Sequence, residues 1–291
     1  MVKFLSVEGI TIRNVNVGDI AEVIANLCME ANYYLGRDVL EGLRAARERE
    51  VSPTGRDILE QLLQNADIAR DEKMPICQDT GFAVVFVELG QEVRLVGGDL
   101  NEAINAGVRK GYETGYLRKS IVNHPFLREN TGDNTPAVIH IKIVPGDKIK
   151  LTLAPKGGGS ENMSALKMLK PADGERGVKD FVVDVVRRAG SNACPPLVVG
   201  VGIGGNMEKV AQLSKEALLR ELGQASKIPD IAVLEKELLE EINRLGIGPQ
   251  GLGGRITALA VHIEIHPTHI ASLPVAVNLN CHVARHKEIK L

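Results

Sequence analysis

The first seventy residues carry apolar side chains at the spacing of amphipathic helices. One helical face combines offsets 0, 3, 4, 7, 8 and 11, at Ile20, Val23, Ile24, Leu27, Cys28 and Ala31. Asp19 precedes most of this face and is the expected N-cap. A second helix is predicted over about 38–48, and a third starts at Ser52-Pro53, a cap followed by proline. We therefore expect a helical N-terminal subdomain over about residues 1–72.

Short runs rich in β-branched residues follow this helical region. Residues 82–89 (FAVVFVEL) predict a strand, and a helix is expected over about 100–118. The runs 137–144 and 148–154 flank a Pro-Gly-Asp turn and predict a β-hairpin. Helical and strand patterns then alternate to the end of the chain. The expected class is α/β (mixed α+β), with mixed sheets flanked by helices in a single catalytic domain over 1–291.

Composition narrows the function classes. The chain has 291 residues, 44% hydrophobic, and a formal net charge of −2, which is ordinary for a globular protein. With 3% aromatic residues and no Trp, it lacks the stacking side chains typical of nucleic-acid binders. No apolar run reaches the roughly 18–20 residues of a membrane span, and the first residues do not resemble a signal peptide. We therefore expect a cytoplasmic protein that binds neither nucleic acid nor membrane.

Four cysteines are the chief candidates for chemistry. Cys28 lies on the apolar helical face, where free cysteine behaves as a small hydrophobe. Cys77, Cys194 and Cys281 instead lie beside predicted strands, 117 and 87 residues apart. Their spacing lacks the close Cys pairs of structural zinc sites and no local signature marks a nucleophile. A Cys₃His zinc site, a thiolate nucleophile, a 4Fe–4S cluster on three thiolates and unrelated buried thiols all remain open at this point.

Five segments are unusually dense in Gly, Pro, Asn or nucleophilic side chains. They are PICQDTG (75–81), NTGDNTP (130–136), APKGGGSEN (154–162), NACPP (192–196) and HPTHIASLPVAVNLNCH (266–282). In this order, and with VARH after the last one, they resemble the class I fumarase family and its relative L-tartrate dehydratase. The resemblance covers nearly the whole chain and is to the α subunit of the two-subunit form. The motifs are specific as a set, although each is weak by itself.

The resemblance implies an iron–sulfur hydro-lyase. Cys77, Cys194 and Cys281 fall at the family's three cluster ligands, so a 4Fe–4S cluster with one open iron is expected. An open iron can act as a Lewis acid on substrate oxygens. The KGGGSEN segment looks more like the fumarase side of the family, so reversible hydration of fumarate to L-malate, a tricarboxylic acid cycle reaction, is the leading expectation. L-tartrate dehydration is the alternative.

The same resemblance implies roles for five further residues. Asp79 and His269 are the candidate catalytic residues, either of which has a side chain able to protonate a leaving hydroxide. Gln78, Arg118 and Gly158 are the candidate substrate-binding residues; the guanidinium suits a carboxylate and a triple glycine exposes backbone N–H groups. Taken alone, each also fits a turn, a cap or a helix end.

In the family, the base that removes the carbon-bound proton belongs to a C-terminal domain, as do further residues that bind substrate carboxylates. This chain ends ten residues after Cys281, so we expect a separate β subunit and a hetero-oligomer such as α2β2. Two other readings stay open. A non-catalytic, cluster-bearing scaffold subunit would not need Gln78 or Asp79. A dinucleotide fold is suggested weakly by Gly200, Gly202 and Gly205, which fit G-x-G-x-x-G.

Overall fold

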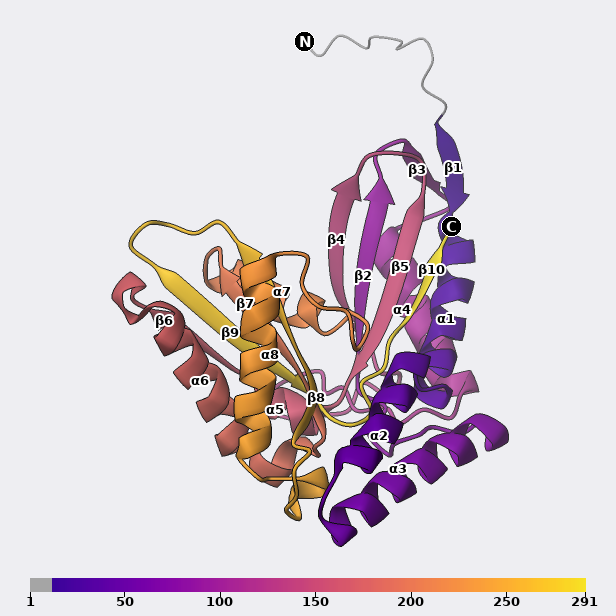
Figure 1. The fold of residues 1–291 in the computed structure, drawn as a ribbon. Helices are drawn as coiled ribbons and strands as arrows, with labels where there is room; N and C mark the ends of the chain where they lie inside the picture. Colours follow the sequence, from indigo (N-terminus) through magenta and orange to yellow (C-terminus); the bar gives the residue numbers. More distant parts are fainter. Residues whose placement is uncertain (1–11) are drawn as a thin grey trace. The chain divides into compact units, whose positions relative to one another are not determined.

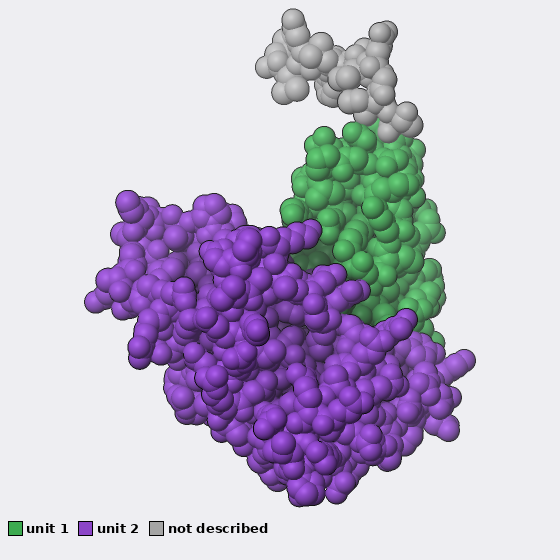
Figure 2. All heavy atoms as spheres, in the orientation of Figure 1, with its two compact units in different colours: residues 1–32, 80–155, 286–291 green, residues 33–79, 156–285 purple. Residues whose placement is uncertain are grey.

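The computed structural model describes residues 12–291, which divide into two compact units (Figure 2). Of the described residues, unit 1 comprises 12–32, 80–155 and 286–291, and unit 2 comprises 33–79 and 156–285. The chain start, where no signal peptide is expected, lies outside the described residues. Among the described helices, none combines the length and apolar character that crossing a membrane requires.

Unit 1 combines a sheet with two long helices (Figure 1). Its elements are β1 (Arg13–Asn16), α1 (Val17–Tyr33), β2 (Phe82–Gly90), β3 (Val93–Val96), α4 (Leu100–Thr114), β4 (Val138–Val144), β5 (Ile149–Lys156) and β10 (Lys287–Lys290). The strand order is β10-β5-β2-β4, and β1 pairs with β3. Gly107 and Gly111 bring α4 close to α1, because a Cβ atom there would lie 2.5 and 2.6 Å from backbone oxygens of Ala21 and Ala25.

The predicted hairpin of residues 137–144 and 148–154 is wrong. Its two runs do form β4 and β5, but β2 lies between them and pairs in parallel with β4. The connection after β4 crosses the end of β2, where Gly90 N donates to Lys148 O at 2.8 Å. A Cβ atom on Gly90 would lie 2.3 Å from Gly146 O, so glycine makes this crossing possible. Local turn chemistry predicted the turn that joins β4 to β5, but not which strands pair with each other in the sheet.

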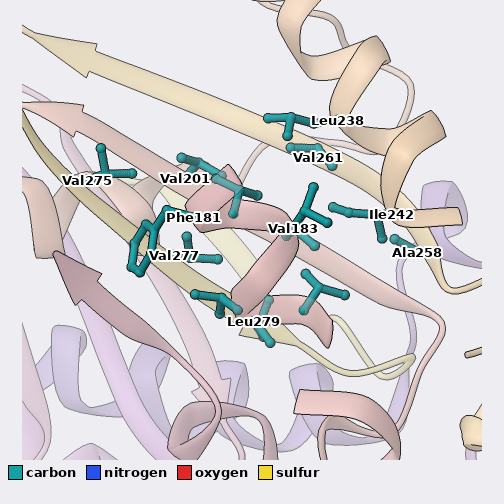
Figure 3. Packing of buried hydrophobic residues seen from close by; sticks show 14 of the residues in the cluster. Phe181, Val183, Val201, Leu238, Ile242, Ala258, Val261, Val275, Val277 and Leu279 are labelled. Carbon is teal, nitrogen blue, oxygen red and sulfur yellow. The ribbon is translucent and has the colours of Figure 1, made fainter. Parts of the chain in front are cut away.

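Unit 2 packs helices on a second four-stranded sheet of order β6-β9-β7-β8. Its elements are α2 (Arg37–Arg49), α3 (Pro53–Glu72), α5 (Gly158–Asn162), β6 (Ala165–Leu169), α6 (Gly174–Ala189), β7 (Leu197–Gly204), α7 (Met207–Ala217), α8 (Pro229–Arg244), β8 (Ala258–His266) and β9 (Leu273–Asn280), with 3₁₀ turns at Pro171–Asp173, Gly190–Ala193 and Pro249–Gly251. The central strand β7 is antiparallel to β9 and parallel to β8. Figure 3 shows side chains of α6, α8 and the sheet strands in one apolar core.

The glycines of the G-x-G-x-x-G pattern let α7 lie directly on β7. A Cβ atom on Gly200 would approach Ser214 O to 2.2 Å, and one on Gly202 would approach Val210 O to 2.3 Å. Close helix–strand packing therefore accounts for Gly200 and Gly202 without a dinucleotide.

The α/β class is confirmed, with helices and mixed sheets throughout the described chain. The third helix begins as expected, since Ser52 Oγ accepts from Gly55 N at 3.2 Å. Two boundaries differ. Asp19 lies in the first turn of α1 rather than at its cap, and α4 ends at Thr114, four residues before Arg118. That the whole chain forms a single catalytic domain stays a prediction.

Candidate active site

Two of the candidate ligands lie at the same end of the two inner strands of the unit 2 sheet. Cys194 precedes β7 and Cys281 follows β9. Because these strands are antiparallel, with Val198 opposite Asn280, the start of one lies beside the end of the other. The backbone N–H of His282 donates to the carbonyl oxygen of Cys194 at 3.2 Å, which ties the two cysteine segments together.

Cys77 approaches the same place from the loop after α3. Burial raises the pKa of both Cys194 and Cys281, and the nearby Cys77 thiol adds to the rise in each. All three cysteines are half-buried, free thiols of unit 2. Residues that lie far apart in the sequence therefore converge, as the cluster hypothesis requires.

The loop that carries Cys77 is fixed by hydrogen bonds at several points. Asn65 Nδ2 donates to Ile76 O at 2.8 Å, the Cys77 thiol donates to Gln78 Oε1 at 3.3 Å, and Asp79 N donates to Cys77 Sγ at 3.4 Å. Gln78 is exposed and Asp79 is half-buried. Both predicted residues therefore lie directly beside the first cysteine, as their adjacency in the chain requires.

The side chain of Asp79 is joined to the triple-glycine segment. Its Oδ2 accepts a hydrogen bond from Gly158 N at 2.7 Å. A Cβ atom on Gly157 would lie 3.2 Å from Asp79 Oδ2, and a Cβ atom on Gly158 would lie 3.8 Å from the same oxygen. Because these two residues have no side chains, the Asp79 carboxylate can approach their backbone. The predicted residues Asp79 and Gly158 are therefore in direct contact.

Sequence reasoning missed two buried cations beside the cysteines. Arg285 is 6% exposed, and its Nη2 donates to the Asp79 carbonyl oxygen at 2.6 Å. Its Nε is buried without a hydrogen-bond partner among the described residues. Lys156 is 7% exposed, and its Nζ donates to Leu279 O at 2.7 Å and to Ser160 Oγ at 2.9 Å. The basic residues of KGGGSEN and NLNCHVARH were the available signal.

Both cations act on the half-buried thiol of Cys281. Burial is the largest influence on the pKa of Cys281 and raises it, whereas Arg285 and Lys156 act in the opposite direction. Burial likewise lowers the pKa of Lys156, to about 8, against the opposing pull of the Glu161 carboxylate. The pair therefore supplies positive charge where three thiolates would gather.

The chemistry of the three cysteines suits an iron–sulfur cluster. Three sulfurs are the soft ligands that iron–sulfur clusters take. Among residues 12–291, no three side chains of His, Cys, Asp or Glu converge as tightly as one ion requires. A cube of iron and sulfide is wider than an ion, and its negative charge would be offset by Arg285 and Lys156.

The other two predicted site residues are not placed beside the cysteines by the contacts within unit 2. Arg118 belongs to unit 1, where its side chain is exposed and its carbonyl oxygen accepts from Thr80 Oγ1 at 2.9 Å. His269 lies in the exposed turn between β8 and β9, where its Nδ1 accepts from Ala271 N at 3.1 Å. This turn is at the opposite end of β9 from Cys281. An eight-residue strand spans roughly 26 Å, so unit 2 does not bring His269 to the cysteines.

Cys28 occupies the structural position expected for it. It is fully buried on α1, and burial strongly raises the pKa of its thiol. Gly111 packs against it, since a Cβ atom at that glycine would lie 2.8 Å from Cys28 Cβ.

The chain is similar to known proteins over most of its length. The model of the fumarate hydratase (Fumerase) family matches residues 21–290. A Methanocaldococcus jannaschii protein named "Putative L(+)-tartrate dehydratase subunit alpha" is 45% identical over 280 residues, which cover 94% of this chain and 98% of that protein. An L(+)-tartrate dehydratase subunit alpha from Escherichia coli is 34% identical over 279 residues, covering 94% of this chain and 91% of that protein.

Proposed function

The chain belongs to the fumarate hydratase (Fumerase) family, a family of hydro-lyases, and on that premise we propose that it is the α subunit of an iron–sulfur enzyme that adds or removes water across a carbon–carbon bond of a small dicarboxylic acid. The observation that carries this proposal is the convergence of Cys77, Cys194 and Cys281 in unit 2, with Asp79 beside them. Cys77 and Cys281 pack against the same apolar cluster, and His282 N, next to Cys281, donates to Cys194 O. Two buried cations, Arg285 and Lys156, suit the charge of the cofactor.

In this proposal the three cysteine thiolates hold a 4Fe–4S cluster. When bound, the cluster supplies an iron without a protein ligand, which acts as a Lewis acid toward the oxygens of the substrate. Gln78 is exposed next to Cys77 and offers an amide to the substrate. Arg118 is proposed to hold a substrate carboxylate with its bidentate guanidinium.

Asp79 is the proposed acid. In dehydration, the C–O bond breaks with its electron pair on oxygen, and a proton from the Asp79 carboxyl makes the leaving group water. The hydrogen bond from Gly158 N to Oδ2 fixes the orientation of this carboxyl. Its position next to Cys77 favours Asp79 over His269, which lies beyond the far end of β9 from Cys281. Gly158, the predicted substrate-binding glycine, therefore acts here on the acid, since its N–H is already donated to Asp79.

The second proton of the reaction, on carbon, needs a base. We propose that a separate β subunit supplies it, in a hetero-oligomer such as α2β2. The relatives are named as alpha subunits, which supports a partner chain. The cysteines are free thiols, which agrees with a reducing compartment such as the cytoplasm.

The leading substrate pair is fumarate and L-malate, because the family model is that of fumarate hydratase and KGGGSEN resembles the fumarase side. L(+)-tartrate is the second candidate, and the names of the two relatives favour it. L-malate and L(+)-tartrate are both four-carbon dicarboxylates with a hydroxyl group on one carbon of the bond across which water is lost. The same residues would therefore handle either one.

The test is anaerobic reconstitution of the chain with iron and sulfide, followed by assays with and without a co-expressed β subunit. We expect about four irons per chain, and activity only with the partner. Initial rates on L-malate, fumarate and L(+)-tartrate are compared in the same preparation. A higher kcat/KM on tartrate would replace fumarate as the substrate. Iron binding without activity on any of the three would favour a non-catalytic scaffold, and the absence of iron would reject the cluster.

A further inference from the structure

The loop between α8 and β8, residues 245–257, reaches the cysteine segments although it contributes none of the proposed ligands or catalytic residues. Gln250 lies at its centre in the left-handed region, with φ 52° and ψ 17°. Its backbone N–H donates to Pro195 O at 2.7 Å, and its side-chain Nε2 donates to the same oxygen at 2.8 Å. Pro195 directly follows Cys194, so Gln250 holds the carbonyl next to one proposed ligand.

The same amide also reaches the segment of the other cysteine. Gln250 Nε2 lies 3.1 Å from Nδ1 of His282, the residue after Cys281. The same Nδ1 lies 3.2 Å from the carbonyl oxygen of Cys194, to which His282 N also donates, so the His282 ring lies between Gln250 and the Cys194 carbonyl. The Nε2 group of Gln250 therefore contacts both cysteine segments, at Pro195 O and at His282 Nδ1.

The loop that presents Gln250 is itself held rigidly. Glu50 is fully buried, and its carboxylate accepts from Arg255 N and Ile256 N, each at 2.8 Å. Directly after Gln250, Gly251 packs on the turn before Cys194, where a Cβ atom would lie 2.3 Å from Ser191 Cβ. A side chain on a loop fixed at these two points can hold its partners in place rather than follow them.

We propose that Gln250 is a positioning residue that sets the spacing of Cys194 and Cys281, and thereby the fit and retention of the cluster. This inference rests on the proposed iron–sulfur site. Gln250 itself coordinates no iron. It acts through the backbone next to Cys194 and the ring next to Cys281, in the manner of the outer-shell groups whose loss costs about 10–100-fold in metal affinity or activity.

The backbone conformation of Gln250 makes a clean variant available. Glycine adopts positive φ without strain, so Gln250→Gly keeps the backbone bond to Pro195 and removes only the side chain. Gln250→Glu keeps the size but replaces the amide donors with a carboxylate facing the Pro195 carbonyl. Leu252→Ser is the matched control, because Leu252 is in the same loop and 65% exposed.

The first measurement is the rate at which a chelator removes iron from the reconstituted chain. We expect release about tenfold faster from Gln250→Gly than from wild type or Leu252→Ser, and faster still from Gln250→Glu. The apparent Tm of the iron-free Gln250→Gly chain should match that of the control. A general loss of folding would lower the Tm of Gln250→Gly as well as its retention of iron. Release from Gln250→Gly at the wild-type rate would overturn the proposal.

A second measurement does not depend on iron. In a Cys77→Ser background without cofactor, a short dithiol-bridging reagent is expected to link Cys194 to Cys281, since the remaining thiol, Cys28, is fully buried. Gln250→Gly should lower the yield of this link, and Leu252→Ser should not. If wild type binds no iron, the proposed function fails, and the bridging yield alone decides whether Gln250 joins the two segments. An unchanged yield rejects the role of Gln250.

Discussion

The backbone N–H of Gly158 donates to Oδ2 of Asp79 at 2.7 Å, so the triple-glycine segment and the first cysteine loop meet through one hydrogen bond. The proposed acid is thereby held from two sides, since its own carbonyl oxygen accepts from Arg285 Nη2. A carboxyl group that is already held in place loses little conformational entropy when it reaches the geometry for proton transfer.

Replacing Asp79 with Asn should remove the acid and keep its contacts. The Asn Oδ1 can still accept from Gly158 N, so the chain should load iron normally. We expect kcat of the αβ enzyme to fall by about 10²–10⁴-fold, the range for loss of a general acid. Rates at saturating substrate and iron content of the same preparation check this.

His269→Gln is the companion variant. Because His269 lies beyond the far end of β9 from Cys281, we expect its kcat to stay close to wild type. A loss as large as that of Asp79→Asn would mean that another chain brings His269 to the site.

Replacing Cys77 with Ser should abolish cluster binding, because one of three soft ligands is lost. Iron and sulfide content after reconstitution, and the visible absorption of the cluster, measure this. Cys28→Ala is the matched control: its buried thiol is far too hard to ionise to serve as a ligand, so iron content should stay normal. Equal iron in Cys77→Ser and wild type would contradict the assignment.

Replacing Arg285 with Met should destabilise the chain even without iron. The variant loses a hydrogen bond from a charged group to Asp79 O, which typically contributes about 1.5–3 kcal/mol. Urea unfolding of the cofactor-free chain measures the free energy of unfolding. Arg187→Met is the control, since Arg187 is 59% exposed and its pairing with Asp184 at 3.9 Å should contribute little. Equal stability of both variants would show that the cost of burying the guanidinium cancels its bond.

Glu161 predicts an acid-sensitive contribution to stability. Burial alone would raise the pKa of this carboxyl, but Lys156 and Lys215 lower it to about 2, from an ordinary value of 4.5. The folded state therefore binds fewer protons than the unfolded state in this range, and the contribution is complete above pH 4.5 and lost as the pH falls toward 2. The difference in urea midpoint between wild type and Glu161→Gln should shrink over that interval. Glu208→Gln, on the exposed first turn of α7, should show a constant difference.

Local sequence patterns determined much of the fold and part of the site. The apolar spacing on α1 and the Ser52 cap of α3 depend on neighbours within a few residues, and both were predicted closely. The three loop cysteines stood out because their surroundings were unlike those of Cys28. Asp79 next to Cys77 needed no tertiary information, since the two are neighbours in the chain.

Contacts between distant residues were decided by the tertiary structure alone. The order of β5, β2 and β4 depends on which strands pair across the sheet, and the turn between two of them does not record it. The positions of Arg285 and Gln250 beside the cysteine segments arise because β7 and β9 run antiparallel and the 245–257 loop is anchored on Glu50. Hydrophobic periodicity is a local property, whereas the spacing of three thiols 117 and 87 residues apart is set by the packing of the whole of unit 2.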